Sequence, residues 1–287
     1  RSCYRALRRV GLEPRVVNVY GPLAPDPLLV EEFLPAIEDG PCGQLNVFLI
    51  NGDEVEPVLE RLGERVPAAA SNVVVPMWEL ERYPLPWARQ LERFDEVWVP
   101  SAFVRDAIEP VVRRPVVLIP CANGVRVGPP LGRRYFGIRE SAYVFLFAFD
   151  LRSYVERKNP LAVLSAFEQL VRARPRADLS LVIKIGGGRD PEKGTGEVAR
   201  EIRQRAAACP SPIVLIDRDI LDHEVKSLLR SCDAFVSLHR SEGFGRLMAE
   251  SMLLAKPVIA TAYSGNLEFM TPETSFLIPH RLVDVGP

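Results

Sequence analysis

Two glutamates, Glu242 and Glu250, have the clearest chemical potential in this sequence and lie eight positions apart within Ser237-Leu-His-Arg-Ser-Glu-Gly-Phe-Gly-Arg-Leu-Met-Ala-Glu250. The pattern predicts a strand, a glycine-containing turn and then a helix. Such a turn lets the backbone approach a ligand closely, and the free N–H groups at the helix N-terminus suit a phosphate. Two carboxylates on either side of a bound diphosphate could hold two hydroxylated parts of one ligand. In the alternative interpretation, Glu242 caps the helix and Glu250 lies on its solvated face.

This segment resembles the paired-glutamate motif of glycosyltransferase family 4, in the form found in bacterial group 1 enzymes, with Gly243, Phe244 and Gly245 between the glutamates. The resemblance implies that Glu242 contacts the donor sugar, that Glu250 binds the ribose hydroxyls of the nucleotide, and that the Gly-Phe-Gly residues line the donor site. It further implies the GT-B fold and a retaining hexosyl transfer from a nucleotide-diphosphate sugar to a glycan or lipid-linked acceptor, as in polysaccharide biosynthesis.

A second match to the same family lies upstream, where Arg152 and Lys158 stand six positions apart after an apolar run. The resemblance implies that these two cations bind the diphosphate. A nucleoside diphosphate gains charge as the bond to the sugar breaks, and fixed cations stabilise that charge in the transition state without a metal. We therefore expect a metal-independent enzyme with no cofactor besides its co-substrate. The alternative is a surface basic cluster that includes Arg157.

Four further residues are candidates for the site, and three of them have a second interpretation. His239 either lines the sugar pocket or is a buried histidine at a strand end, and Asn266 either contacts the sugar or makes a turn. Trp78 and Glu79 are candidates for the acceptor side, because aromatic faces stack on sugar rings, but Trp78 is equally suited to core packing. The acceptor-side catalytic arrangement stays open, since several family members use a first-domain histidine and all three histidines here lie in the second half.

The pair Asp217 and Asp219 is superficially similar to the Asp-x-Asp metal motif of another glycosyltransferase fold. It follows a strand late in the chain and precedes a helix, so a capping role is the simpler interpretation. We expect no metal site there.

Short apolar runs alternate with helical patterns along the whole chain, which predicts a doubly wound α/β fold with parallel strands. The expected strands are Arg15–Val19, Leu45–Ile50, Asn72–Pro76, Glu96–Val99, Val116–Ile119, Tyr143–Phe149, Leu179–Ile185, Ile213–Ile216, Ala234–Leu238, Pro257–Thr261 and Phe276–Ile278. The expected helices are Tyr4–Val10, Asp53–Arg65, Ala102–Ile108 with Ser101 as its N-cap, Pro160–Arg172, Gly196–Ala208, Asp222–Ser231 and Gly245–Leu254.

The pattern is interrupted around Cys121–Arg139, which predicts two Rossmann-like domains with a ligand cleft between them. Residues 1–128 would form an acceptor-side domain, and residues 129–287 a nucleotide-sugar-binding domain. Because the chain opens inside a helix and closes directly after a strand, we expect that the first strand of one domain and the end of the other are missing.

Composition limits the partners. The net charge is −1, which gives no electrostatic reason for a nucleic-acid partner. Five scattered cysteines indicate reduced thiols and a cytoplasmic location. Arginines crowd the first expected helix, namely Arg1, Arg5, Arg8 and Arg9, so peripheral contact with the inner membrane face is an alternative to a solvated helix. No apolar run approaches the roughly 20 residues that span a bilayer.

Two other functions use the same features. The first is a sugar-nucleotide epimerase or a phosphorylase on the same fold, and the second is a non-catalytic module that binds nucleotide sugars. The presence of Glu242, Arg152 and Lys158 together argues against the non-catalytic module.

Overall fold

The computed structural model describes residues 2–19, 36–37, 42–67, 69–125, 128–151, 153–187 and 196–283. The chain divides into two compact units, Arg1–Ala122 and Asn123–Pro287. This division falls six residues before the predicted boundary between 128 and 129, inside the predicted linker.

The first unit contains a parallel sheet with the strand order β1-β2-β3-β4 in its described part. The strands are β1 (Leu45–Phe48), β2 (Ser71–Val74), β3 (Glu96–Val99) and β4 (Val116–Leu118). The helices of this unit are α1 (Ser2–Arg9), α3 (Val55–Leu62), α4 (Leu85–Leu91) and α5 (Ala102–Ile108). Strand order follows chain order, as expected where each crossover helix leads to the adjacent parallel strand.

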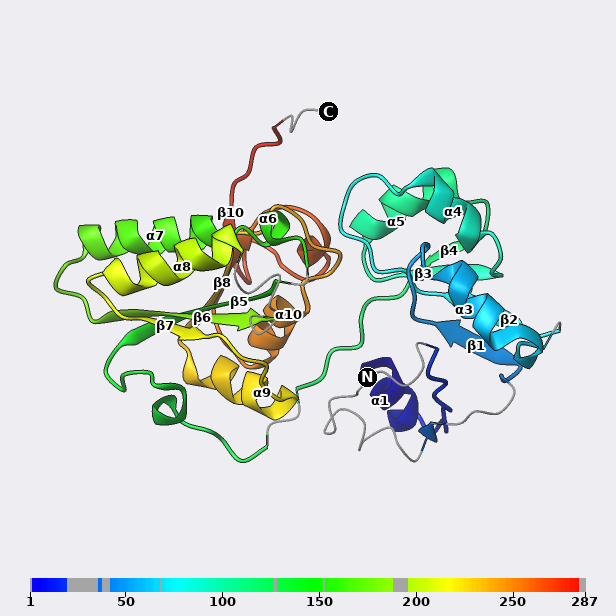
Figure 1. Ribbon diagram of the computed structural model, residues 1–287, viewed down its shortest axis with the longest axis horizontal. Coiled ribbons are helices and arrows are strands. Elements are labelled where there is room, and N and C mark those ends of the chain that lie inside the picture. Colours follow the sequence, from blue (N-terminus) through cyan, green and yellow to red (C-terminus); the bar gives the residue numbers. More distant parts are fainter. Residues whose placement is uncertain are drawn as a thin grey trace. The chain divides into compact units, whose positions relative to one another are not determined.

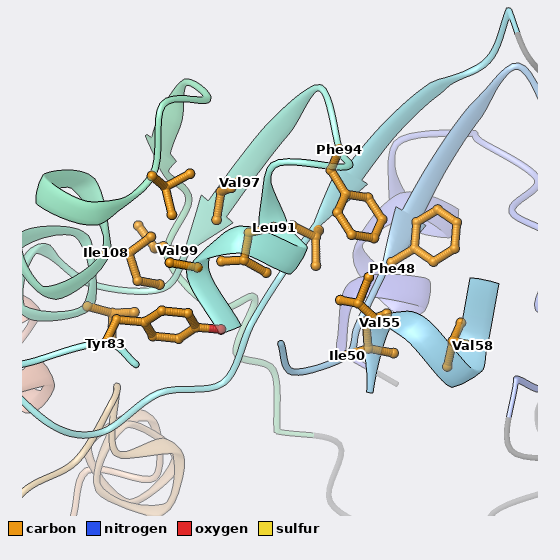
Figure 2. Packing of buried hydrophobic residues seen from close by; sticks show 14 of the residues in the cluster. Phe48, Ile50, Val55, Val58, Tyr83, Leu91, Phe94, Val97, Val99 and Ile108 are labelled. Atoms are coloured by element: carbon orange, nitrogen blue, oxygen red, sulfur yellow. The ribbon is translucent and has the colours of Figure 1, made fainter. Parts of the chain in front are cut away.

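The core of the first unit forms where helices α3, α4 and α5 cover the sheet (Figure 2). Val55, Val58 and Leu62 are buried at helical spacing on α3, and the Phe48 and Phe94 rings meet edge-on with centroids 5.1 Å apart. Each such buried side chain contributes roughly 1.5–3 kcal/mol. The predicted N-cap of α5 is confirmed, because the Ser101 hydroxyl accepts a hydrogen bond from the Val104 N–H at 3.3 Å.

One predicted strand is wrong. Within Arg15–Val19 the described structure has only an isolated parallel bridge between Val16 and Ile37. A run of apolar residues becomes a strand only where a neighbour supplies a full ladder of hydrogen bonds, and a single bridge does not.

The second unit contains a parallel sheet with the order β10-β9-β8-β5-β6-β7 in its described part (Figure 1). The strands are β5 (Tyr143–Asp150), β6 (Leu179–Gly186), β7 (Ile213–Ile216), β8 (Ala234–Ser237), β9 (Val258–Thr261) and β10 (Phe276–Ile278). The helices are α6 (Val155–Lys158), α7 (Pro160–Ala173), α8 (Glu197–Ala208), α9 (Asp222–Ser231) and α10 (Arg246–Leu253). The chain runs from β5 outward to β7 and then returns to the other side of β5 with β8.

Both faces of this sheet are covered, as a doubly wound fold requires. On β5, Val144 and Leu146 point into one core with α9 and α10, whereas Phe147 and Phe149 point into the other with α7 and α8. Figure 1 shows α7 and α8 on one face and α9 on the opposite face. The α/β fold with parallel, Rossmann-like sheets is therefore confirmed. No helix in the described part of the chain is long and apolar enough to cross a bilayer.

Candidate functional site

The candidate site lies where the strand order of the second unit reverses. The strands β5 and β8 are neighbours in the sheet but are far apart in the sequence, and the chain leaves them toward opposite sides. In open parallel sheets, ligands bind beyond the carboxyl ends of the strands at such a switch point. The segments that follow β5 and β8 carry Lys158 and Glu242, two of the predicted catalytic residues.

The turn after β8 is shaped by Gly245, which precedes α10 with φ +87°. A side chain is strained at that φ, and a Cβ atom there would also collide with the end of Met248. The helix therefore begins from a left-handed glycine and has no side-chain cap. The alternative interpretation of Glu242 as a helix cap is wrong.

The segment after β9 is hydrogen-bonded to this turn. The Gly265 N–H donates to the Glu242 carbonyl at 2.8 Å, and the Glu242 N–H donates to the Ser264 hydroxyl at 2.8 Å. A Cβ atom on Gly265 would meet the backbone of Gly243, so only glycine permits this approach. The two loops therefore form one unit that fixes the backbone of Glu242.

The Glu242 carboxylate is held by two cations from α6. Its Oε1 contacts the Lys158 ammonium, and its Oε2 lies 3.2 Å from the Arg157 guanidinium. All three side chains are largely buried, with Glu242 12% exposed. A carboxylate in such surroundings is stabilised by its ion pairs and is not a solvated surface group.

The short helix α6 is tied to the end of β8 by its own backbone and side chains. Arg157 donates to the Ser241 carbonyl at 2.9 Å and accepts at its own carbonyl from the Arg240 N–H at 2.8 Å. Asn159, in the left-handed conformation at φ 54°, donates to the Leu238 carbonyl at 2.9 Å. Lys158 therefore lies between two fixed neighbours. The other predicted diphosphate ligand, Arg152, lies outside the described residues.

The second glutamate is buried, so its predicted alternative position on a solvated helix face is wrong. Glu250 is 4% exposed on α10, and its Oε2 lies 2.5 Å from the ammonium of Lys226, which α9 contributes. Its Oε1 faces Arg246 at 3.9 Å. One oxygen is thus engaged by a buried cation, and the other points toward an exposed arginine.

His239 and Asn266 connect the loops after β8 and β9. His239 is 1% exposed, with Nδ1 3.0 Å from the Ser237 hydroxyl and Nε2 3.1 Å from the Asn266 amide oxygen. The Asn266 amide donates to the Thr261 carbonyl at 3.0 Å. These contacts give both residues a role in holding the site together, and direct contact with a donor stays a prediction. Burial is the main cause that lowers the pKa of His239 below its ordinary value.

The buried His239 is expected to make the free energy of unfolding depend on pH. Because the pKa of His239 is depressed in the folded state, the unfolded chain takes up a proton first as the pH falls below about 6.5. The free energy of unfolding should be undiminished above that pH and should then fall by up to about 1.4 kcal/mol per pH unit until the folded state is protonated too. Denaturant titrations between pH 8 and pH 5 measure this.

A matched pair of variants isolates the effect of His239. H239Q is expected to reduce the fall in the free energy of unfolding below pH 6.5. H223Q, which removes an exposed histidine of the same unit, is expected to show the same fall as the parent protein. Equal pH dependence of H239Q and the parent protein would contradict the assignment.

Phe244 and the two glycines beside it shape the turn. Phe244 is buried and packs against Phe269, with ring centroids 4.9 Å apart. The backbone of Gly243 packs closely against Gly265. These residues set the form of the turn, and their predicted contact with a donor stays a prediction.

The first-unit candidate Trp78 belongs to an aromatic cluster. Its ring meets Tyr83 and Trp87 edge-on, at centroid distances of 5.1 and 5.5 Å, and it packs against the core. Burial raises the pKa of Tyr83, which is consistent with a dry cluster. Core packing therefore accounts for Trp78, while Glu79, next to it in the chain, stays an acceptor-side prediction.

The aspartates after β7 have other partners. Asp217 forms an ion pair with Arg203, and Asp219 accepts from the Gly187 N–H at 3.4 Å. In the described ranges, no three His, Cys, Asp or Glu side chains come together as a group that could hold a metal ion.

Two residues of this site were missed in the sequence. The sequence pattern places Arg157 only in a surface basic cluster, yet it contacts Glu242, and no pattern in the sequence marks Lys226. Arg157 is adjacent to Lys158 in the sequence, and this proximity indicates that it could belong to the same site. Lys226 lies at i+4 from Asp222, a spacing more typical of solvated helix pairs.

The two parallel α/β sheets have the Rossmann-like architecture of the GT-B fold. Residues 142–284, just under half of the chain, match the family model of Glycosyl transferases group 1. An uncharacterized glycosyltransferase of Methanocaldococcus jannaschii is 47% identical over 55 residues, which is 19% of this chain and 15% of that protein.

Solved structures share the fold at low sequence identity. A point mutant of TarM from S. aureus matches with a TM-score of 0.56 and 14% identity over 79% of this chain and 44% of its own. Sucrose-phosphate synthase from Thermosynechococcus elongatus matches with a TM-score of 0.63 and 20% identity over 82% of this chain and 60% of its own. The chain spans less than two thirds of the length of each of these proteins.

Proposed function

We propose that this protein is a retaining glycosyltransferase that moves a hexose from a nucleotide-diphosphate sugar to a glycan or lipid-linked acceptor. The observation that carries the proposal is the contact between Glu242 and Lys158 at the switch point of the second unit. The TarM structure, solved in complex with UDP, supports a nucleotide ligand for this fold. The second unit would bind the donor, and the first unit would contribute to the acceptor side.

Lys158 would act on the leaving group. The bond between the anomeric carbon and the diphosphate oxygen breaks with its electron pair on that oxygen, and a fixed ammonium stabilises the developing charge. Glu242 contacts this ammonium and balances its charge. A diphosphate that binds here would replace that carboxylate as the partner of Lys158. Glu242 would keep its ion pair with Arg157 through its other oxygen. Arg152 is proposed as the second cation.

Glu242, once separated from Lys158, would face the sugar. An ionised carboxylate only accepts hydrogen bonds and is therefore suited to sugar hydroxyls. Its backbone is fixed by Gly265 and Ser264, so its geometry is preorganised. Glu250 would bind the ribose hydroxyls through the oxygen that is not engaged by Lys226. No metal or further cofactor is part of the proposal.

Turnover of radiolabelled sugar nucleotides tests the function directly. We expect one member of a panel of UDP-, GDP-, ADP- and dTDP-hexoses to release its nucleoside diphosphate and to pass the labelled sugar to an acceptor glycan or polyprenyl lipid. The product of a retaining enzyme keeps the anomeric configuration of the donor, which nuclear magnetic resonance of the product reads out.

The panel also separates the rival functions. A non-catalytic module would be stabilised against heat by a nucleotide sugar but would release no diphosphate. An epimerase would return a changed sugar nucleotide or free sugar without any acceptor. Either result, with the intact protein and a full acceptor panel, would contradict the transferase.

A further inference from the structure

Lys226 is a buried lysine outside the segments that the proposed mechanism uses. It lies on α9 and is 4% exposed, although lysine is seldom buried unless it is paired. Removing an ammonium from water is costly, and the cost is offset only when an opposite charge lies close in good geometry. The buried position of Lys226 therefore depends on the groups that face it.

Those groups are two carboxylates. The Lys226 ammonium is 2.5 Å from Oε2 of Glu250 and 3.5 Å from Oδ1 of Asp222. The contact with Glu250 is an ion pair whose angle falls outside hydrogen-bond geometry. Asp222 is one helical turn away on α9 and is more exposed than Glu250. The shorter contact thus connects α9 to the carboxylate of α10.

The contact leaves the two oxygens of Glu250 in different surroundings. Oε2 is engaged by a buried cation, whereas among the described residues Oε1 faces Arg246 alone, at 3.9 Å, and the Arg246 side chain is 60% exposed. An ionised carboxylate has about four acceptor positions, so Oε1 keeps capacity for further donors. The open side of the carboxylate is therefore the side of Oε1.

We propose that Lys226 is a positioning residue of the donor site, which fixes the Glu250 carboxylate so that Oε1 receives the ribose hydroxyls of the nucleotide. The proposal rests on the ribose role of Glu250 given above. The ammonium holds one oxygen and balances its charge, and the ligand uses the other. Lys226 would thus control how strongly the site prefers ribose over a sugar without hydroxyls.

A comparison of two ligands measures this preference. UDP, GDP and ADP are each titrated calorimetrically beside their 2′,3′-dideoxy counterparts, and the tightest of the three is used for all variants. Hydrogen bonds to a charged carboxylate predict that the intact protein binds the ribose form roughly 10- to 100-fold tighter. The ratio of the two dissociation constants reports the ribose contact alone, because both ligands share the base and the diphosphate.

K226M is expected to bring this ratio close to one, with the dideoxy affinity hardly changed. K226Q, which keeps a hydrogen-bond donor but not the charge, should give an intermediate ratio and decides the matter if K226M does not fold. R205M is the matched control, since it removes the ion pair of Arg205 with Glu168 between α8 and α7, on the other face of the sheet. It should lower stability without changing the ratio.

A lower melting temperature in K226M or K226Q with an unchanged ratio would overturn the proposal, because Lys226 would then serve only to connect α9 and α10. The failure of the underlying function looks different. An intact protein that does not distinguish ribose from dideoxyribose, and an E250Q variant that binds like it, would refute the ribose role of Glu250 and the proposal with it.

Discussion

Replacing Lys158 by alanine is expected to lower kcat roughly 100-fold, the scale of about 3 kcal/mol that one preorganised charge contact contributes to a transition state. The ammonium lies next to Glu242 at the carboxyl end of β5, where a leaving diphosphate would gain charge. The donor KM should change less than kcat, because the charge grows only as the bond breaks. Steady-state kinetics with varied donor measures both.

The fold should survive this substitution, because Glu242 keeps its contact with Arg157. K256A is the matched control. Lys256 donates to the Arg230 carbonyl and stands just before β9, at the opposite end of the strands from the site. Chelators should leave the activity of the parent protein nearly unchanged. Full activity of K158A, or a large loss in K256A, would contradict the assignment.

The strands of the second unit could be predicted almost to the residue. Strands buried on both faces appear in the sequence as continuous apolar runs, and Tyr143–Phe149 differs from β5 only by the added Asp150. Phe276–Ile278 and Ile213–Ile216 coincide with β10 and β7. The motifs that carry Lys158 and Glu242 follow such strands directly, so their placement at the switch point could also be predicted from the sequence.

Two short helices, α4 and α6, have no clear signal in the sequence. Helix α4 carries Pro86 in its first turn and follows Pro84, and its seven residues are too few to establish a helical period. Helix α6 has only four residues. Helix existence in both cases depends on tertiary contacts, such as the burial of Leu91 in the core of the first unit.

The charged part of the site is the least visible in the sequence. Asp222 and Lys226, four positions apart, have the spacing of an exposed helix pair, yet Lys226 is buried against Glu250. The partner comes from another helix, so no local pattern marks it. Trp78 forms an aromatic cluster with Tyr83 and Trp87, which are close to it in the sequence. The sequence alone does not distinguish such a packing cluster from aromatic residues that bind a sugar.

The two glutamates should respond differently to replacement, and the difference is the sharpest test of the site. Glu250→Gln would remove the proposed ribose contact, which is the same before and during the reaction, so the donor KM should rise with less effect on kcat. Its buried partner Lys226 would keep only the longer contact with Asp222, and breaking a buried pair costs up to about 3–5 kcal/mol of stability. Activity must therefore be measured below the lowered melting temperature.

Glu242→Gln is expected to lower kcat by about 100-fold, because in the proposed mechanism this carboxylate would contact the sugar, where charge and geometry change as the bond breaks. Free nucleoside diphosphate separates the two roles, since it has ribose and diphosphate but no sugar to transfer. Its affinity should fall in Glu250→Gln. In Glu242→Gln it should hardly change or should rise, because the substitution removes the charge that occupies Lys158 in the free protein. Equal losses of diphosphate affinity in both variants, or the opposite order, would mean that the two roles are assigned the wrong way round even within the right family.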